Sequence, residues 1–138
     1  MICSLFVGAA LANGQTTHMW ISHEALDVLP EGELKSFLEV PEHLAALENG
    51  TMFPDGGYAV DHPYGETAHW EPFQGLYRDW ILDNFEGPDD PEAALYVAFY
   101  LGMASHGMAD QVFDALYMER SLQKDAEFGW ATGESLDT

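Results

Sequence analysis

The sequence predicts an all-α fold, and three observations lead to that prediction. Apolar residues recur at helical spacing in several segments, proline and glycine separate these segments, and no stretch alternates convincingly between polar and apolar residues as a strand would. A chain of 138 residues, of which 47% are hydrophobic, is long enough to bury one core and short for two. We therefore expect one compact multi-helix bundle.

The first half of the chain is expected to form three helices. The first lies in THMWISHEALDVLP, with Thr17 placed to cap its start and Pro30 just beyond its end. Two short helices are expected next, in EGELKSFLEV and PEHLAALENG. Pro41 closes the former and opens the latter, and Asn49-Gly50 is typical of a helix end.

A loop and two further helices are expected in the second half. The helical period is lost over residues 50–66, where proline and glycine are frequent, and this stretch predicts a loop. One helix follows in WEPFQGLYRDWILDNF. The longest helix opens with Asp90 as its N-cap and Pro91 at its first position, and it is expected to run to about Arg120. The tail from Ser121 is polar and contains glycine.

The charge balance argues against some partners. Four Lys and Arg residues stand against 24 Asp and Glu residues, which gives a formal net charge of −20. Such a surface repels a phosphate-rich polymer, so nucleic acid is not an expected partner. The acid excess names no substrate by itself, because its simplest interpretation is a solvated surface.

Residues 1–12 are expected to be a partial signal peptide. They form an apolar run that is too short to span a bilayer and ends in the small-x-small pattern Ala10-Leu11-Ala12. A first core helix is the alternative, because a basic start is missing. Cleavage at this point would leave residues 13–138 as a secreted or periplasmic domain. That domain would contain no cysteine, since Cys3 is the only one, which excludes disulfides and thiolate-bound metals.

The longest expected helix carries polar residues on its apolar side. A stripe at three- or four-residue steps runs through Leu95, Phe99, Gly102, His106, Asp110 and Asp114. A buried carboxylate or imidazole needs a compensating partner, and Lys and Arg are scarce in this chain. A divalent metal is the most economical partner, although His106 and Asp110 alone also fit an ordinary hydrogen-bonded helix pair.

Three further residues strengthen the metal hypothesis. Asp55 lies in MFPDGG, His69 precedes Trp70 in ETAHW, and His18 opens the first helix. Together with the helix pair they form a set of imidazoles and carboxylates that zinc accepts in the absence of thiolates. Each also has an ordinary interpretation: His18 as a solvated first-turn residue, Asp55 as a turn former, and His69 as a helix cap.

Other residues with metal-binding or aromatic side chains are given simpler roles. His43 has no companion and is interpreted as a surface histidine, while His23 lies on a different side of its helix from His18 and is expected in the core or in support of a ligand. Four aromatic residues at helical spacing are interpreted as core, and one of them, Trp70, is also placed to line a pocket. They are Trp70, Tyr77, Trp80 and Tyr96.

Four motifs in this order resemble a known family. THMWISHEAL, FPDGGY, ETAHWEPF and GMASHGMADQVF are similar to the zinc-dependent phospholipase C family, and within it to the catalytic domain of the glycosylphosphatidylinositol-specific phospholipase D branch. The resemblance covers Gly14 to about Tyr117. It implies an all-helical domain with a cleft in which three zinc ions bind the phosphodiester and activate water.

The resemblance also implies roles for individual residues. The metal ligands carried over are His18, Asp55, His69, His106 and Asp110. Asp55 is further implied as general base, and Asp110 as a bridge between two metals. His18 would work with the α-amino group of Asn13, the first residue after cleavage.

The chain departs from the family pattern at two places. Asp114 stands where the phospholipase D branch has a histidine, and a carboxylate is a harder, more anionic zinc ligand. The family's last ligands are a histidine and an acid one turn apart, yet no histidine follows His106. Either Glu127, Glu134 or Asp137 takes over, or the chain stops before these ligands. Two or three zinc ions are therefore expected.

The expected function is that of a zinc-dependent phosphodiesterase. The resemblance implies hydrolysis of a phospholipid or glycosylphosphatidylinositol phosphodiester at a membrane surface by metal-activated water. Because the surface is acidic, we expect a zwitterionic head group or a lipid-anchored glycan as substrate. Two alternatives stay open: a single-strand nuclease-like zinc phosphodiesterase, with Trp70 or Tyr58 stacking on bases, and a non-catalytic zinc-binding module that lacks the last ligands.

Overall fold

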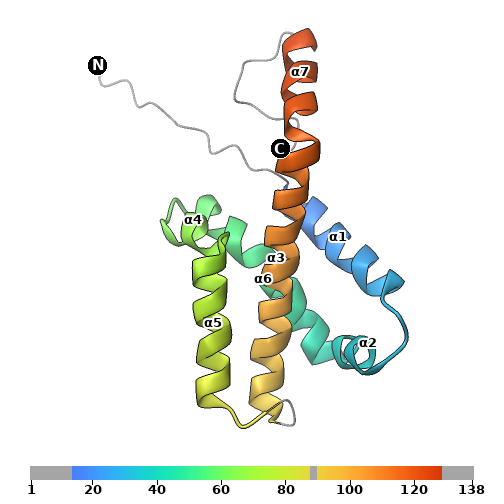
Figure 1. Cartoon of the computed structure of the whole chain (residues 1–138), viewed down its shortest axis with the longest axis vertical. Coiled ribbons are helices and arrows are strands. Elements are labelled where there is room, and N and C mark those ends of the chain that lie inside the picture. Colours follow the sequence, from blue (N-terminus) through green and yellow to red (C-terminus); the bar gives the residue numbers. More distant parts are fainter. Residues whose placement is uncertain (1–13, 88–89, 129–138) are drawn as a thin grey trace.

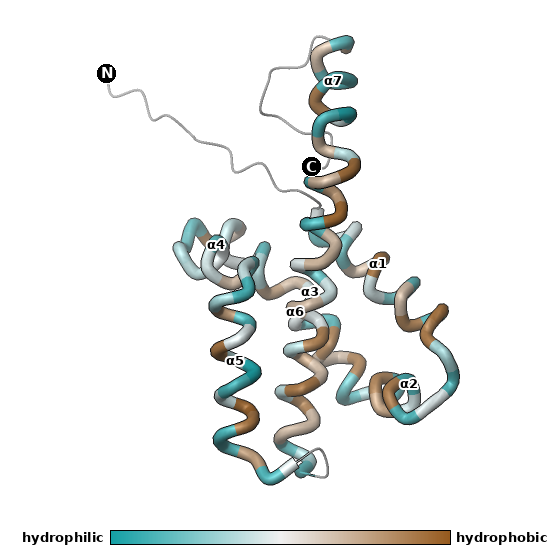
Figure 2. Tube along the Cα trace, viewed as in Figure 1, coloured by the Kyte–Doolittle hydropathy of each residue, from teal (hydrophilic) through white to brown (hydrophobic). Residues whose placement is uncertain are grey.

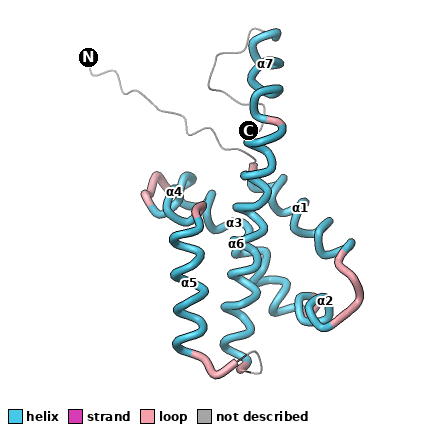
Figure 3. Tube along the Cα trace, viewed as in Figure 1, coloured by secondary structure: helices cyan, strands magenta, loops and turns pink. Residues whose placement is uncertain are grey.

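A computed structural model describes residues 14–87 and 90–128, and these residues fold into seven helices (Figure 1). The helices are α1 (Gln15–Val28), α2 (Glu33–Leu38), α3 (Pro41–Ala59), α4 (Tyr64–Ala68), α5 (Glu71–Asn84), α6 (Pro91–Leu116) and α7 (Met118–Phe128). The described residues contain no strand, which confirms the all-α prediction (Figure 3). The expected leader, Glu134 and Asp137 lie outside the described residues.

The crossing of α3 and α6 forms the centre of the bundle. These two helices share the largest contact in the described chain, with α5 on one side of α6 and α1 on the other (Figure 1). Glycine makes the crossing possible. A Cβ atom on Gly50 would overlap the backbone of Phe99, and one on Gly102 would overlap the backbone of Leu47 and Thr51. The two helix backbones therefore approach more closely than side chains would permit.

Apolar packing surrounds this crossing on both sides. Leu38, Leu47 and Ala98 are buried together between α2, α3 and α6. On the other side, aromatic rings from α3, α5 and α6 form a contiguous group that includes Phe53, Phe99 and Tyr77, with ring centroids 5.3 Å and 5.8 Å from Phe99. In Figure 2 the first half of α6 is mostly apolar, whereas α5 alternates between hydrophilic and apolar turns, as a helix with one buried side should.

The expectation that four aromatic residues are core residues holds only in part. Tyr77 and Tyr96 are half-buried in the aromatic group, and burial raises the pKa of Tyr77 to about 12. Trp70 and Trp80 are 45% and 42% exposed, so their placement in the core was wrong. Trp80 covers the edge of the aromatic group by stacking at right angles on Tyr96.

The predicted loop over residues 50–66 was also wrong in its first part. Helix α3 continues through Asn49-Gly50 and Pro54 to Ala59. Pro54 cannot donate to the carbonyl of Gly50 and would ordinarily break a helix. Here, packing of α3 on α6 outweighs this local cost, because Gly50, Thr51 and Pro54 all lie buried in the crossing region.

Helix ends followed the sequence signals at some places only. Asp90 caps α6 by accepting the backbone N–H groups of Glu92 and Ala93, and Pro91 opens the helix as expected. Helix α1 begins at Gln15 after Gly14, so Thr17 is not its cap. Helix α6 ends at Leu116, short of the expected end, and α7 follows in the polar tail.

None of the described helices combines the length and the apolar content that a crossing of the lipid bilayer requires.

Candidate metal centre

Five of the six residues predicted as metal ligands meet at one buried place. His18 comes from α1, Asp55 from α3, His69 from the end of α4, and His106 and Asp110 from one face of α6. Each is at most 8% exposed. Because the α3–α6 crossing lies one to two turns away, the close approach of these helices brings Asp55 within reach of the α6 pair.

The ligand atoms are spaced as around metal ions. Nε2 of His18 and of His106 lies 3.1 Å and 3.2 Å from Asp110 carboxylate oxygens, and Nε2 of His69 lies 3.3 Å from Asp55 Oδ1. Two ligands of a tetrahedral zinc ion, each about 2.0–2.2 Å from it, lie roughly 3.3–3.6 Å apart. In two groups of three, the ligand atoms all lie within 4.8 Å of one another: His18, His106 and Asp110, and Asp55, His69 and His106.

Backbone carbonyls fix the orientation of two of the imidazoles. Nδ1 of His106 lies 2.8 Å from the carbonyl oxygen of Thr51, and Nδ1 of His69 lies 2.6 Å from that of Gly65. A carbonyl oxygen can only accept, so Nδ1 donates in both contacts and carries the hydrogen. In the neutral rings Nε2 therefore presents its lone pair to the centre, as a metal ligand must.

Several buried polar atoms at this centre lack a hydrogen bond. They are both ring nitrogens of His18, Nε2 of His106, Oδ2 of Asp55 and Oδ1 of Asp110. Leaving so many buried polar atoms without partners is costly, and a cation among them would remove that cost. The stacked rings of His18 and His106, 3.6 Å apart, also direct their nitrogens to the same region. The residues present therefore fit a zinc centre of nitrogen and oxygen ligands.

The electrostatics keep Asp110 in the form that binds cations. Burial alone would raise the pKa of this carboxyl, but the His106 and His18 rings beside it lower the pKa well below its usual range. For His69, burial opposes the charged ring, yet the contacts with Asp55 and the Gly65 carbonyl raise its pKa. Asp110 is consequently an anion at neutral pH.

Gln74 links the backbone at His69 to α6, and it was not identified from the sequence. This side chain of α5 is buried, and its Nε2 lies 3.3 Å from the carbonyl oxygen of His69 and 3.4 Å from that of Met103 on α6. Gly107 makes room for it, because a Cβ atom there would lie 2.9 Å from Gln74 Nε2. One inward-facing amide in an amphipathic helix gives no sequence signal of such a role.

Replacing Gln74 with methionine is expected to loosen the centre. The volume is nearly kept, but the donor that holds the His69 backbone to α6 is lost. We expect a loss of about 1 kcal/mol in the free energy of unfolding and a roughly tenfold weaker zinc affinity. Denaturant unfolding and competition titration with a chromogenic chelator measure both. Gln111→Met, at an exposed position of α6, is the control, and equal zinc affinities in the two variants would contradict this role.

The structure does not bring Asp114 into either group. It is exposed on α6, one turn beyond Asp110. Glu127 is likewise exposed, and its carboxylate pairs with Lys124 at 2.6 Å. The described residues thus contain five converging candidate ligands and no sixth.

Two histidines differ from their sequence interpretation. His43 is half-buried rather than on the surface, because its Nδ1 donates to the carbonyl of Phe37 at 2.7 Å and its ring packs on that phenyl group. His23 neither lies in the core nor touches a candidate ligand. Its half-exposed ring pairs with Glu48 at 2.9 Å.

An acid holds two aromatic side chains beside the centre. Glu66 accepts from the Tyr58 hydroxyl at 2.6 Å and from Nε1 of Trp70 at 2.7 Å. These hydrogen bonds lower the pKa of Glu66, while burial and the bond to Glu66 raise the pKa of Tyr58. The Tyr58 ring lies 5.1 Å from that of His69, so this fixed trio borders the buried ligands.

Comparison with known proteins decides the family. The family model described as zinc dependent phospholipase C matches residues 17–113, which include all five converging residues. The chain belongs to the zinc-dependent phospholipase C family. The buried His/Asp residues of the candidate site therefore lie inside the segment that matches this family.

Curated relatives of this zinc-dependent phospholipase C family member carry a more specific name. The phosphatidylinositol-glycan-specific phospholipase D of Mus musculus is 31% identical over 88% of the chain, and that of Homo sapiens is 31% identical over 79%. The protein of the same name from Dictyostelium discoideum is 28% identical over 70% of the chain. The matches cover 16%, 14% and 10% of these relatives' own lengths. No solved structure matches the chain.

Proposed function

We propose that this protein is a zinc-dependent phosphodiesterase that hydrolyses a phospholipid or glycosylphosphatidylinositol phosphodiester with water as the nucleophile. The observation that carries the proposal is the convergence of three imidazoles and two carboxylates in which Nε2 of two rings and one oxygen of each carboxylate are buried without a hydrogen bond. Family membership supports the chemistry, and the name shared by the relatives supports the substrate class.

With two zinc ions bound, the centre would carry a net positive charge although the protein as a whole is acidic. His18, His106 and Asp110 would hold one ion, and Asp55 with His69 would hold a second one beside it. When bound, zinc polarises the phosphodiester oxygens and lowers the pKa of a coordinated water. Two divalent ions outweigh the two carboxylates, so the loaded centre attracts an anionic phosphodiester even though the chain carries a net charge of −20.

Asp55 is the residue best placed to handle the proton. Its Oδ1 faces His69 and His106 at 3.3 Å and 3.8 Å, while Oδ2 is buried and makes no hydrogen bond. One carboxylate oxygen can thus face the ligands while the other accepts a proton from water or orients that water. Asp110, by contrast, faces histidines with both of its oxygens.

The acidic surface sets the kind of membrane that the protein approaches. A net charge of −20 opposes approach to vesicles of purely anionic lipid, and this repulsion is absent for zwitterionic lipid. We therefore propose a zwitterionic head group or a lipid-anchored glycan as the substrate. Faster turnover on purely anionic vesicles at low salt would contradict this choice.

Replacing Asp55 with asparagine is expected to lower phosphodiesterase activity by about 100-fold or more, since the proton acceptor is lost while a neutral oxygen ligand is kept. The assay uses zinc-loaded protein on phosphatidylcholine vesicles and on a phosphatidylinositol glycan, with chelator-treated protein beside it. Asp83→Asn, at an exposed position of α5, is the control and should keep full activity.

Three outcomes would contradict the proposal, the first in the role of Asp55 and the other two in the function itself. Full activity of Asp55→Asn would remove Asp55 from the reaction. Hydrolysis of single-stranded DNA faster than of either lipid would favour the nuclease alternative. Fewer than two tightly bound zinc ions per chain, measured by elemental analysis, together with no lipid hydrolysis, would favour a non-catalytic zinc-binding module.

A further inference from the structure

Three hydroxyl groups meet where the three ligand-bearing helices come together. Ser22 on α1 lies 3.1 Å from the hydroxyl of Thr51 on α3 and 2.8 Å from that of Ser105 on α6. Ser22 is 4% exposed and Thr51 is fully buried. None of these hydroxyls belongs to the candidate ligands, so their position beside the centre needs a separate explanation.

Each hydroxyl lies within one helical turn of a candidate ligand on its own helix. Ser22 follows His18 by four residues, Thr51 precedes Asp55 by four, and Ser105 immediately precedes His106. The network therefore ties α1, α3 and α6 together directly beside the atoms whose relative positions define the centre.

The network also continues into the ligand His106. The carbonyl of Thr51 accepts the Nδ1–H of this ring at 2.8 Å. Pro54 removes the hydrogen bond that the neighbouring Gly50 carbonyl would otherwise accept, so the helical ladder is already open at this turn. Thr51 thus makes both contacts: its hydroxyl meets Ser22 on α1, and its carbonyl accepts from His106 on α6.

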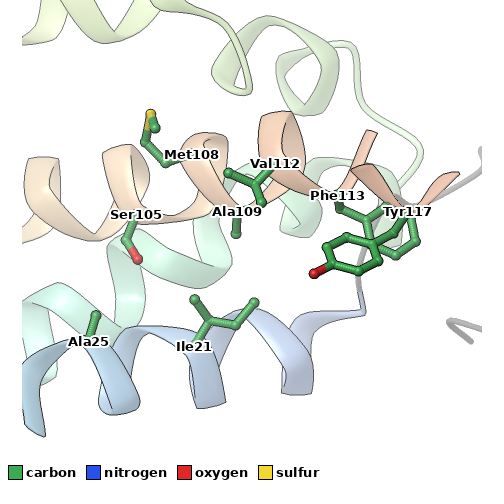
Figure 4. Close-up of a pocket in the computed structure, with 8 residues that line it drawn as sticks. All are labelled: Ile21, Ala25, Ser105, Met108, Ala109, Val112, Phe113 and Tyr117. Atoms are coloured by element: carbon green, nitrogen blue, oxygen red, sulfur yellow. The ribbon is translucent and has the colours of Figure 1, made fainter. Parts of the chain in front are cut away.

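The hydroxyl of Ser105 contacts Ser22 although Ser105 also lines a groove. Ser105 lines a groove of about 390 Å³ between α1 and α6, whose other lining residues are mostly apolar (Figure 4). In that view its oxygen points towards α1, and the Ser22 hydroxyl that it contacts at 2.8 Å lies on that helix. Within the described chain the three hydroxyls thus satisfy one another across three helices.

We infer that Ser22, Thr51 and Ser105 are positioning residues of the metal centre. They hold the Thr51 carbonyl on Nδ1 of His106, and this contact keeps Nε2 of His106 directed at both groups of ligands. The inference rests on the proposed zinc centre. Apolar side chains of similar size would fill the same space, but they would leave the register of the three helices and the tilt of the His106 ring less well defined.

Thr51→Val and Ser22→Ala test this role, with Thr51→Ser as the conservative variant. Cobalt(II) serves as the probe because its visible absorption reports ligand geometry, and zinc affinity is measured by competition. Thr51→Val and Ser22→Ala should weaken zinc binding by about tenfold or more and change the cobalt spectrum, whereas Thr51→Ser keeps both near wild type. Ser105→Ala should have a smaller effect, because the Ser22–Thr51 bond remains.

Metal-free protein provides a second readout. Nitrogen-15 NMR of the imidazole rings identifies which nitrogen of His106 carries the hydrogen. In the wild-type protein the Nδ1–H form should dominate, and in Thr51→Val and Ser22→Ala the two neutral forms should be mixed. This measurement still tests the network if the wild-type chain binds no zinc or cobalt, an outcome that would overturn the proposed function instead.

Leu38→Ala distinguishes an effect on ligand positions from a general loss of stability. Leu38 lies in the core cluster between α2 and α3, away from the centre, so its truncation lowers the melting temperature without touching the hydroxyls. At a temperature where this variant is folded, its zinc affinity and cobalt spectrum should equal those of the wild type. If Ser22→Ala and Thr51→Val also lower only the melting temperature, the inference is wrong. Should Thr51→Val not fold, Ser22→Ala decides alone.

Discussion

Replacing Asp110 with asparagine is expected to abolish zinc-dependent stabilisation and lipid hydrolysis together. Asp110 faces all three imidazoles of the centre, with carboxylate oxygens 3.1 Å from His18, 3.2 Å from His106 and 3.7 Å from His69. Asparagine keeps the shape but removes the negative charge, and its amide N–H group is a donor that cannot bind a cation. We expect zinc affinity to fall by roughly 100-fold or more.

Thermal unfolding with and without zinc measures this loss. At a zinc concentration 100 times the wild-type Kd, binding adds about 2.7 kcal/mol to the free energy of unfolding, and this gain should nearly vanish in Asp110→Asn. The matched control is Asp114→Asn, four residues later on the same helix, where the carboxylate is exposed and belongs to neither ligand group. If Asp114→Asn loses zinc and Asp110→Asn does not, the roles assigned to these residues by the geometry are reversed.

Gly102→Ala is expected to have the largest effect on stability. Its Cβ atom would overlap the backbone of Leu47 and Thr51, and backbone atoms at a helix crossing cannot rotate away as a flexible side chain can. Helices α3 and α6 would have to separate. We expect a loss of about 3 kcal/mol and a fall of roughly 10 °C in the melting temperature. Because Asp55 and His106 lie on these two helices, zinc affinity should fall as well.

Gly75→Ala is the control for the change of residue type. Its Cβ atom would meet Glu71 Oε1 at 3.4 Å, an ordinary contact with a flexible exposed side chain. Alanine in a helix restricts the unfolded chain, so this variant should be neutral or up to about 1 kcal/mol more stable. Circular dichroism melts of the two variants measure the difference. Equal melting temperatures would show that the α3–α6 crossing tolerates a Cβ atom and that close backbone approach does not hold the centre together.

The fold class and the converging residues could be predicted because they depend on residue spacing within one segment and on the chemistry of the side chains. His106 and Asp110 stand one turn apart in an apolar helix, where only a compensated site explains them. Asp55 and His69 flank a stretch rich in glycine and proline, and the resemblance of the surrounding motifs added His18.

The remaining features depend on tertiary packing that local signals do not contain. Pro54 and the adjacent glycines indicate a loop by every local rule, yet α3 continues through them because α6 lies against that face. Ser22 and Gln74 give no pattern in sequence, since a single hydroxyl or amide is common in any helix. Asp114 fits the stripe as well as Asp110 does, and only the shape of the bundle leaves it exposed.

His106 belongs to both groups of candidate ligands, and this sharing has a consequence for loading. Its Nε2 has one lone pair, which two cations cannot divide, and Nδ1 is already engaged with a carbonyl. If one cation binds His106, the group at the other position would be left with one imidazole and one carboxylate, either His18 and Asp110 or His69 and Asp55. If cations bind at both positions, the two are therefore unequal: the position that includes His106 would be filled first, and the other would depend on shared carboxylates or on a molecule from solution to complete its coordination.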